Sequence, residues 1–340
     1  MKCPATPCLP APPSSVPELI REMFEMSFVP GYLALHASGE LLRRRDAALA
    51  RLCACDLCPH RCGANRLAGE QGFCRTGRLA AVGAHHPHFG EEAPLVGQGG
   101  SGTIFFANCN LGCVFCQNYE ISHLGEGEEV SAAELAAMMV RLGRQGCHNI
   151  NLVTPSHVVA QILEALPLAV ETGLSVPLVY NTGGYDEVET LRLLDGIIDI
   201  YMPDFKFWSS TSAARFAKAA DYPERARQAI GEMHRQVGDL LINGEGLAER
   251  GLLVRHLVMP EGLDESREIF GFLARELSPC TYVNVMDQYR PCGQAMNFPP
   301  LDRMLRPEEY RQALALAGQA GLTRLEQRDF AAMLRGLGVV

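Results

Sequence analysis

The sequence predicts an α/β protein whose main domain alternates short strands with amphipathic helices. Two observations indicate this fold class. Between residues 102 and 290, short runs rich in β-branched residues alternate with segments of helical periodicity. The chain of 340 residues is also 47% apolar, which is enough to bury a large core. Because such alternation builds parallel sheets through right-handed crossovers, an open partial barrel and a doubly wound sheet both fit.

Six segments are predicted to form the strands of this sheet. Each is short, apolar and bounded by residues that favour turns. In chain order they are 103–107 (TIFFA), 148–153 (HNINLV), 176–180 (VPLVY), 197–202 (IIDIYM), 252–258 (LLVRHLV) and 281–286 (TYVNVM). Six strand–helix units are too few for a closed eight-stranded barrel.

The segments between these strands are predicted to be helices. The helix that begins after Ser131 carries a capping box, because Glu134 follows three residues later. Further amphipathic helices are expected at 18–52, 157–173, 186–196, 223–241, 264–277, 306–321 and 323–338. The predicted organisation is a leader and helix (1–52), a cysteine-rich metal-binding segment (53–100), the barrel (101–290) and a helical extension (291–340).

Charge and apolar patterning exclude several classes of protein. The net charge of −9 disfavours nucleic acid or an anionic membrane as the main partner. No run of 18 apolar residues is present, so no membrane span is expected. Prolines occupy the place where a signal peptide has its apolar region, so we expect a cytoplasmic protein.

Cysteine placement gives the main functional signal. Eight of the 13 cysteines fall in two short clusters, at 53–74 and 109–116, and in a reducing compartment such clustering indicates metal binding. Cys109, Cys113 and Cys116 have the spacing C-x3-C-x2-C directly after the first predicted strand. Three thiolates can hold an iron–sulfur cube and leave one iron open for a ligand. A zinc site completed by Cys147 or His148 is the alternative.

The stretch CNLGCVFC resembles the signature of the radical S-adenosylmethionine (SAM) superfamily, with Phe115 as its aromatic residue. More closely, it and the stretches NINLVTPSH, YNTGGY, DIYMPDFKF and VRHLVMP resemble iron–sulfur proteins similar to pyruvate formate-lyase activating enzyme. The resemblance covers roughly residues 53–310 and implies a six-unit partial (βα) barrel.

The resemblance also implies a function. A [4Fe-4S] cluster on the three cysteines would reductively cleave SAM to a 5′-deoxyadenosyl radical for hydrogen abstraction. The substrate would be a glycyl radical enzyme, or else a peptide or small molecule. A low-potential electron donor such as flavodoxin or ferredoxin is the implied partner. The alternative from another class is a non-catalytic iron–sulfur protein that transfers electrons.

Polar residues follow every predicted strand, where chemistry gathers in parallel sheets. Lys206 is one of only three lysines among 30 basic residues. In the family that the chain resembles, residues matching Asn181-Thr182 and Met202-x-Asp204-x-Lys206 surround the methionine end of SAM. The resemblance thus implies that Lys206 and Arg255 pair with anionic groups of the cofactor and that Asp204 orients them.

This sequence departs from the family pattern at two of those strand ends. Asn181 stands where the family has aspartate, which removes a carboxylate from the implied cation site. VTPSH stands where the family has Gly-Gly-Glu, so Thr154, Ser156 or His157 would have to supply the acceptor for the amino group of SAM.

A second cysteine cluster precedes the barrel. Cys55, Cys58, Cys62 and Cys74 have the spacing C-x2-C-x3-C-x11-C, which provides four ligands for zinc or for a second iron–sulfur cluster. Acidic and histidine side chains follow it and either line the substrate cavity or form a solvated loop: His85, His86, His88, Glu91 and Glu92.

Overall fold

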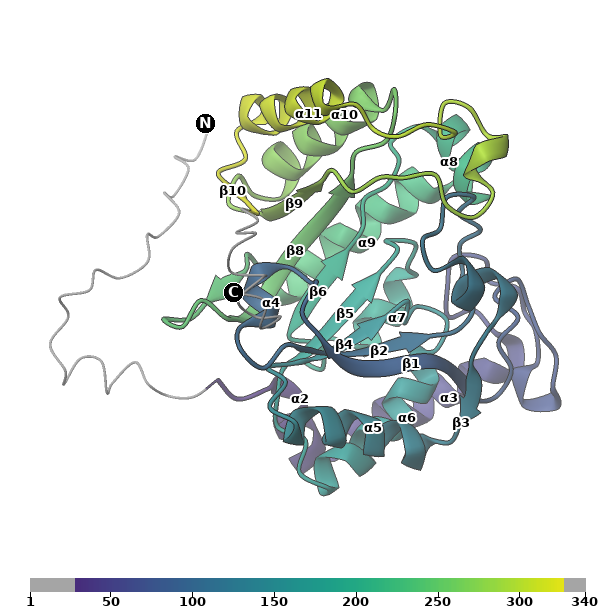
Figure 1. Cartoon of the computed structure of the whole chain (residues 1–340). Helices are drawn as coiled ribbons and strands as arrows, with labels where there is room; N and C mark the ends of the chain where they lie inside the picture. The colour runs from purple at the N-terminus through teal and green to yellow at the C-terminus, as the bar shows by residue number, and fades with distance from the viewer. Residues whose placement is uncertain (1–27, 327–340) are drawn as a thin grey trace, which may run out of the picture.

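The computed structural model describes residues 28–326, which are built around one ten-stranded sheet (Figure 1). Its strands lie in the order β10-β9-β8-β6-β5-β4-β2-β1-β3, and β7 pairs with β8. The strands are β1 (Ala80–His88), β2 (Ser101–Phe106), β3 (Glu128–Val130), β4 (Ile150–Val153), β5 (Leu178–Thr182), β6 (Ile200–Pro203), β7 (Leu241–Ile242), β8 (Ala248–Leu257), β9 (Tyr282–Met286) and β10 (Arg324–Leu325).

All six predicted strands are confirmed, as β2, β4, β5, β6, β8 and β9. They lie side by side in chain order, and each neighbouring pair is parallel. A doubly wound sheet reverses its strand order at a switch point, and this row has no such reversal. The sheet is therefore a six-unit partial barrel, and its right-handed crossovers put the connecting helices on one face.

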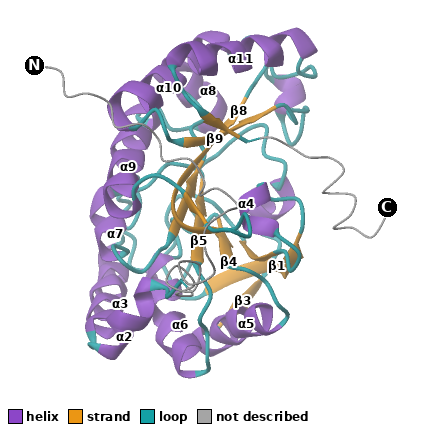
Figure 2. Cartoon of the chain, turned by 90° about the vertical axis from the view of Figure 1, so that its left-hand side faces the viewer, coloured by secondary structure: helices purple, strands orange, loops and turns teal. Residues whose placement is uncertain are grey.

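The helices line the outer face of this sheet, and α4 lies on the inner side (Figure 2). The predicted capping box of Ser131 and Glu134 is confirmed at the start of α5. The helices are α2 (Gly31–Ala37), α3 (Glu40–Ala50), α4 (Ala93–Val96), α5 (Ala132–Arg144), α6 (Val159–Glu171), α7 (Val188–Leu193), α8 (Ser210–Ala217), α9 (Tyr222–Val237), α10 (Leu263–Phe272) and α11 (Pro307–Ala320).

Alternate residues of each strand serve the two faces of the sheet. Outward residues such as Leu152 and Val254 are fully buried in the large core under the helices. On the inner face, Val179 and Met202 pack with Leu95 of α4 in a second, smaller core. This inner core fills the interior below the carboxyl ends of the strands, so that the polar residues of the strand ends form a layer above it.

Several parts of the fold differ from expectation. β1, inside the segment 53–100, is an unpredicted strand that pairs antiparallel with β2, because histidines and Pro87 hide its strand pattern. The short elements β3, β7 and α8 were not predicted either, and the helix predicted at 223–241 ends at residue 237.

The helix predicted at 323–338 is wrong at its start. Arg324 and Leu325 form β10 instead, since the edge of β9 supplies backbone partners. Residues 18–27 and 327–338 of the predicted helices lie outside the described residues.

Between residues 28 and 326, none of the helices combines the length and the apolar character required to cross a membrane.

Candidate active site

The three-cysteine loop leaves the carboxyl end of β2 and is fixed against the end of α8. The N–H groups of Gly112 and Val114 donate to the carbonyl oxygens of Ala217 and Phe216, at 3.0 and 2.9 Å. A Cβ atom on Gly112 would lie 2.7 Å from Cδ of Lys218, so glycine permits this close approach. The loop is therefore held at a defined position on the rim of the sheet.

The thiols of this loop lie close to one another and to one cation, the ammonium group of Lys206. Cys113 is buried, and the N–H of Leu111 donates to Sγ of Cys109 at 3.3 Å. Burial raises the pKa of Cys113 to about 12; Lys206 opposes this rise and Cys116 adds to it. Burial and Cys113 likewise raise the pKa of Cys109. Without a metal, the thiols of Cys109 and Cys113 stay protonated at neutral pH, and a bound metal would hold them as thiolates.

The donor set fits three corners of an iron–sulfur cluster. No three His, Cys, Asp or Glu side chains in residues 28–326 surround the position of a single ion. A [4Fe-4S] cluster does not need that arrangement, because each thiolate binds a separate iron. Hydrogen bonds to the sulfurs are also a feature of such sites. Besides the Leu111 N–H, Oγ of Ser122 lies 3.1 Å from Sγ of Cys116.

The alternative fourth ligands for zinc lie at the wrong end of the sheet. Nε2 of His148 accepts from the N–H of Gly99 at 3.0 Å, just before β2 begins. A Cβ atom on Gly102 would lie 3.1 Å from Cβ of Cys147. The length of β2 therefore separates Cys147 and His148 from the three-cysteine loop at its other end, and these two residues do not complete a zinc site there.

Four predicted site residues meet on the rim above the inner core. Oδ1 of Asp204 accepts from Nε of Arg255 at 2.8 Å, and Oδ2 contacts Nζ of Lys206. Arg255 also donates from Nη2 to Oδ1 of Asn181 at 2.7 Å. Burial opposes ionisation of Asp204, but Arg255 and Lys206 hold the pKa of this carboxyl below its ordinary value. The rim therefore carries a largely buried, ionised triad of one carboxylate and two cations.

Tyr222, the first residue of α9, fixes this triad from outside the sheet. Its hydroxyl accepts from the N–H of Lys206 at 2.9 Å and lies within 3.0 Å of the carbonyl oxygens of Gly183 and Asp204. Sequence reasoning missed this role of Tyr222, because a tyrosine near the start of an amphipathic helix has no functional pattern.

Two glutamates of the loop before α4 complete the rim. Oε2 of Glu91 lies 3.8 Å from Nη1 of Arg255, and Oε1 of Glu92 accepts from Nδ2 of Asn284 at 2.8 Å. Burial and the neighbouring Glu92 raise the pKa of Glu91 to about 7. The sequence-predicted glutamates therefore do lie at the mouth of the barrel, where Glu91 can hold or release a proton near neutral pH.

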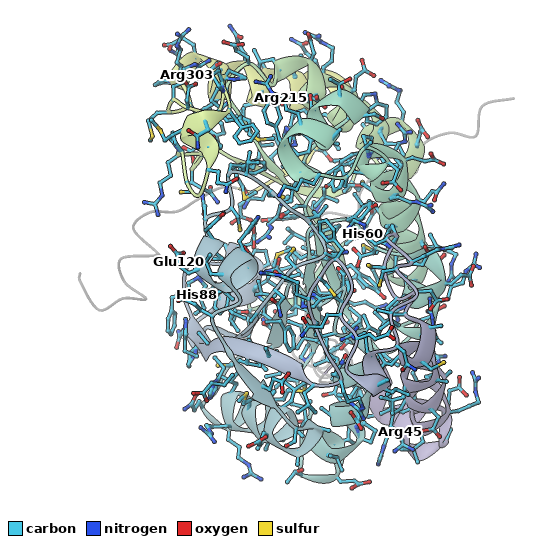
Figure 3. The ribbon with its side chains drawn as sticks, turned by 90° about the vertical axis from the view of Figure 1, so that its right-hand side faces the viewer. Arg45, His60, His88, Glu120, Arg215 and Arg303 are labelled. Atoms are coloured by element: carbon cyan, nitrogen blue, oxygen red, sulfur yellow. The ribbon has the colours of Figure 1, made fainter. Side chains whose placement is uncertain are left out.

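Two histidines of β1 lie beside the amino-terminal half of β2. The rings of His86 and His88 contact Phe105 of β2, with ring centroids 5.8 and 6.2 Å apart (His88 is labelled in Figure 3). Phe105 pairs in register with Val153 of β4, which pairs with Asn181 of β5. Paired residues of neighbouring strands share a face, so these histidines lie on the same inner face as the triad.

The inner face also holds polar atoms that lack partners. Asn151 pairs in register with Val179, is fully buried, and neither polar atom of its amide has a hydrogen-bond partner. Oε2 of the buried Glu92 has none either. Buried polar groups are normally hydrogen-bonded. A polar ligand inside the barrel would supply the missing partners, which supports this face as the binding face.

The side chain of Thr182 points into a hydrogen-bond network. Its hydroxyl donates to Oδ2 of Asp186 at 2.6 Å and lies 2.9 Å from Oγ of Ser156. His157 is buried, and its Nε2 lies 3.0 Å from the carbonyl oxygen of Ala107, just before the three-cysteine loop. Burial lowers the pKa of His157 to about 4, so the ring is neutral. Both side chains brace the loops around the site.

The remaining residues that were predicted to contact the cofactor lie in three different environments. Thr154 ends β4 in a left-handed conformation with φ of 62°. Met202 is fully buried in the inner core below the rim. Phe115 packs its ring against Phe207 and Tyr289 at centroid distances of 6.0 and 6.3 Å. Contact of these residues with a cofactor stays a prediction.

Glu91→Gln is expected to change how stability depends on pH. A carboxyl whose folded-state pKa is raised binds more protons folded than unfolded, so wild-type stability should fall as the pH rises from about 4.5 to about 7. The amide removes this slope. Urea unfolding at several pH values measures it, with the exposed Glu245→Gln as the control. Parallel wild-type and Glu91→Gln profiles would contradict the expectation.

No protein-family model matches the sequence. Uncharacterized protein MJ0674 of Methanocaldococcus jannaschii is 35% identical over 278 residues, which is 79% of this chain and 75% of that protein.

Solved structures also resemble the chain at low identity. Native anSMEcpe with bound AdoMet has a TM-score of 0.44 at 10% identity, over 64% of this chain and 61% of that one. The radical S-adenosylmethionine methyltransferase TsrM of Kitasatospora setae, with cobalamin and a [4Fe-4S] cluster, has 0.44 at 15%, over 71% and 57%. TYW1 with a lysine-pyruvate adduct has 0.38 at 11%, over 65% and 74%.

The chain therefore spans less than two thirds of the first two solved structures. The similarity to MJ0674 is much higher, because the chain is 35% identical to it across three quarters of that protein. On that evidence, the chain belongs to the same protein family as MJ0674 of Methanocaldococcus jannaschii.

Proposed function

We propose that this chain is a radical SAM enzyme. The observation that carries the proposal is the C-x3-C-x2-C loop at the carboxyl end of the first parallel strand, with Lys206 as a cation near its thiols. When bound together, a [4Fe-4S] cluster and SAM supply, on reduction by one electron, a 5′-deoxyadenosyl radical that abstracts hydrogen from a substrate.

The residues of this chain would bind and orient those groups. Cys109, Cys113 and Cys116 would ligate three irons and leave the fourth open to the amino and carboxylate groups of SAM. Lys206 and Arg255 offer the nearby positive charges for anionic groups. Asp204 holds both cations in place through its two oxygens. Because the triad is largely buried, these charges act in a medium of low dielectric constant.

The substrate and partners are part of the same proposal. The sequence resemblance supports a glycine of a glycyl radical enzyme as the substrate, with another peptide or a small molecule as the alternative. Glu91, His86 and His88 would line the substrate side of the inner face as acid–base groups. A low-potential donor such as flavodoxin or ferredoxin would supply the electron, and the unpaired thiols of the loop suit the reducing cytoplasm.

Product analysis tests the proposal. The protein is purified without oxygen, reconstituted with iron and sulfide, and incubated with dithionite and SAM. We expect 5′-deoxyadenosine from the wild type, none from Cys113→Ala, and wild-type amounts from Cys53→Ala, whose thiol is exposed and outside the loop. A reconstituted cluster that forms no 5′-deoxyadenosine would instead favour the non-catalytic electron-transfer protein.

A further inference from the structure

We propose that Cys55, Cys58, Cys62 and Cys74 form a second metal centre, with Arg66 as its buried counter-cation and His60 as its link to the three-cysteine loop. The four thiolates would hold a [4Fe-4S] cluster, in which each binds a separate iron. A single zinc ion does not fit, because no three such side chains in residues 28–326 surround the position of one ion. The proposal does not depend on the proposed function, because metal binding by these residues needs neither SAM nor a substrate.

The four sulfurs belong to one compact segment. Cys55, Cys58 and Cys74 are buried, and Sγ of Cys62 lies 3.8 Å from the carbonyl oxygen of Cys55. The N–H of Gly63 donates to the same carbonyl oxygen at 2.9 Å, so the chain folds back onto Cys55 directly after Cys62. The segment therefore doubles back on itself around these cysteines.

Gly72 allows the backbone of this segment to lie close to the sulfur of Cys62. A Cβ atom on Gly72 would lie 2.3 Å from Sγ of Cys62, a distance that real Cβ atoms do not show. Any side chain at residue 72 would therefore displace Cys62. The backbone of the segment is shaped around the sulfurs, which a chance grouping of surface cysteines would not require.

Arg66 gives the second, independent observation. Only 1% of it is exposed, and its Nη1 lies 3.8 Å from Sγ of Cys55. Nε and Nη1 donate to the carbonyl oxygens of Gly77 and His157, at 2.9 and 2.8 Å, whereas Nη2 has no partner. Within residues 28–326, the ion pairs of the structure include no carboxylate for Arg66. A buried, uncompensated guanidinium is costly.

A metal centre removes this cost. Neutral thiols carry no charge, but metal-bound cysteines are thiolates. Four thiolates around a [4Fe-4S] core of charge +2 carry a net charge of about −2. Arg66 would then face an anion through the sulfur of Cys55. The positive charge thus finds its partner only in the metal-bound protein.

His60 joins this segment to the first cysteine loop. It lies between Cys58 and Cys62 in sequence, and its Nε2 is 2.9 Å from the carbonyl oxygen of Asn110, the neighbour of Cys109 (His60 is labelled in Figure 3). Its ring stacks on Phe73 at a centroid distance of 4.0 Å and meets the edge of Tyr185 at 5.3 Å. One side chain therefore connects the two groups of cysteines.

Metal analysis of the full chain tests the proposal. In the triple variant Cys109→Ala, Cys113→Ala, Cys116→Ala, we expect about four irons with sulfide to remain per chain. Adding Cys55→Ala and Cys58→Ala should remove that metal, and adding Cys53→Ala instead should not. A folded triple variant without metal would overturn the proposal, as would metal that survives the loss of Cys55 and Cys58.

If the triple variant does not fold, the wild type gives the answer. About eight irons per chain would support the second centre, and about four irons would overturn it. Because this count is made without SAM, it is separate from the test of 5′-deoxyadenosine formation. A second centre in a protein that does not cleave SAM would leave this proposal standing and overturn only the proposed function.

Arg66 is tested by metal affinity in the same background. We expect Arg66→Gln to weaken retention of the second metal about tenfold against a competing chelator, and Arg66→Lys to recover part of it. A merely structural arginine would lower the melting temperature of the metal-free protein and leave chelator competition unchanged, which would overturn the counter-cation role.

Discussion

Replacing Gly184 with alanine is expected to lower the free energy of unfolding by about 4 kcal/mol. Gly184 has φ of +81°, and a Cβ atom there would lie 2.2 Å from the carbonyl oxygen of Asp204. Two costs therefore add: the left-handed conformation of a residue with a side chain, and a clash with backbone that cannot rotate away. Urea unfolding followed by circular dichroism measures the loss.

Gly173→Ala separates these two costs. Gly173 also has a positive φ, of +100°, but a Cβ atom there would meet nothing within 4 Å. It should therefore lose only about 1 kcal/mol, from the backbone conformation alone. Equal losses in the two variants would mean that the clash with Asp204 is relieved by a movement of the loop.

Asp204→Asn is expected to destabilise the protein by about 3 kcal/mol at neutral pH. The amide keeps the shape of the side chain but leaves Lys206 and Arg255 as buried cations without the carboxylate between them. Because the pKa of Asp204 is held below its ordinary 3.8, the advantage of the wild type should be full above that value and shrink as the pH falls through the folded-state pKa. Urea unfolding at neutral and acidic pH measures both effects.

An exposed ion pair provides the control for this variant. Glu189 and Arg192 pair on the surface of α7 with side chains 60% and 57% exposed. Glu189→Gln should change the free energy of unfolding by less than about 0.5 kcal/mol. If Asp204→Asn were as mild, or its effect did not depend on pH, the triad would not be the buried and ionised group described above.

The parallel strands were predictable because each is a short apolar run before a turn. Their order was not, because right-handed crossovers fit a partial barrel and a doubly wound sheet alike, and only the family resemblance implied the barrel. The capping box of Ser131 and Glu134 was predictable for a local reason, since its residues are three apart. β1 was not predictable from its own sequence, because its stability comes from pairing with β2, which is a separate segment of the chain.

The site was predictable where it depends on position along a strand. Lys206 and Arg255 follow or end parallel strands, and strand ends converge on one rim. Tyr222 and Arg66 were not predictable, because each acts through contacts with segments remote in sequence. The sequence identifies Glu91 as one of several acidic and histidine residues before the barrel, but only the structure reveals its contact with Arg255.

The shortness of β3 has a consequence for association between molecules. An open sheet, unlike a closed barrel, exposes backbone groups along its outermost strand, and a long edge of this kind recruits other chains into fibres. Here the outermost strand beyond β1 has only three residues, and Glu128 and Glu129 are acidic and exposed. The brevity and negative charge of this border should keep the open sheet from aggregating through edge-to-edge pairing.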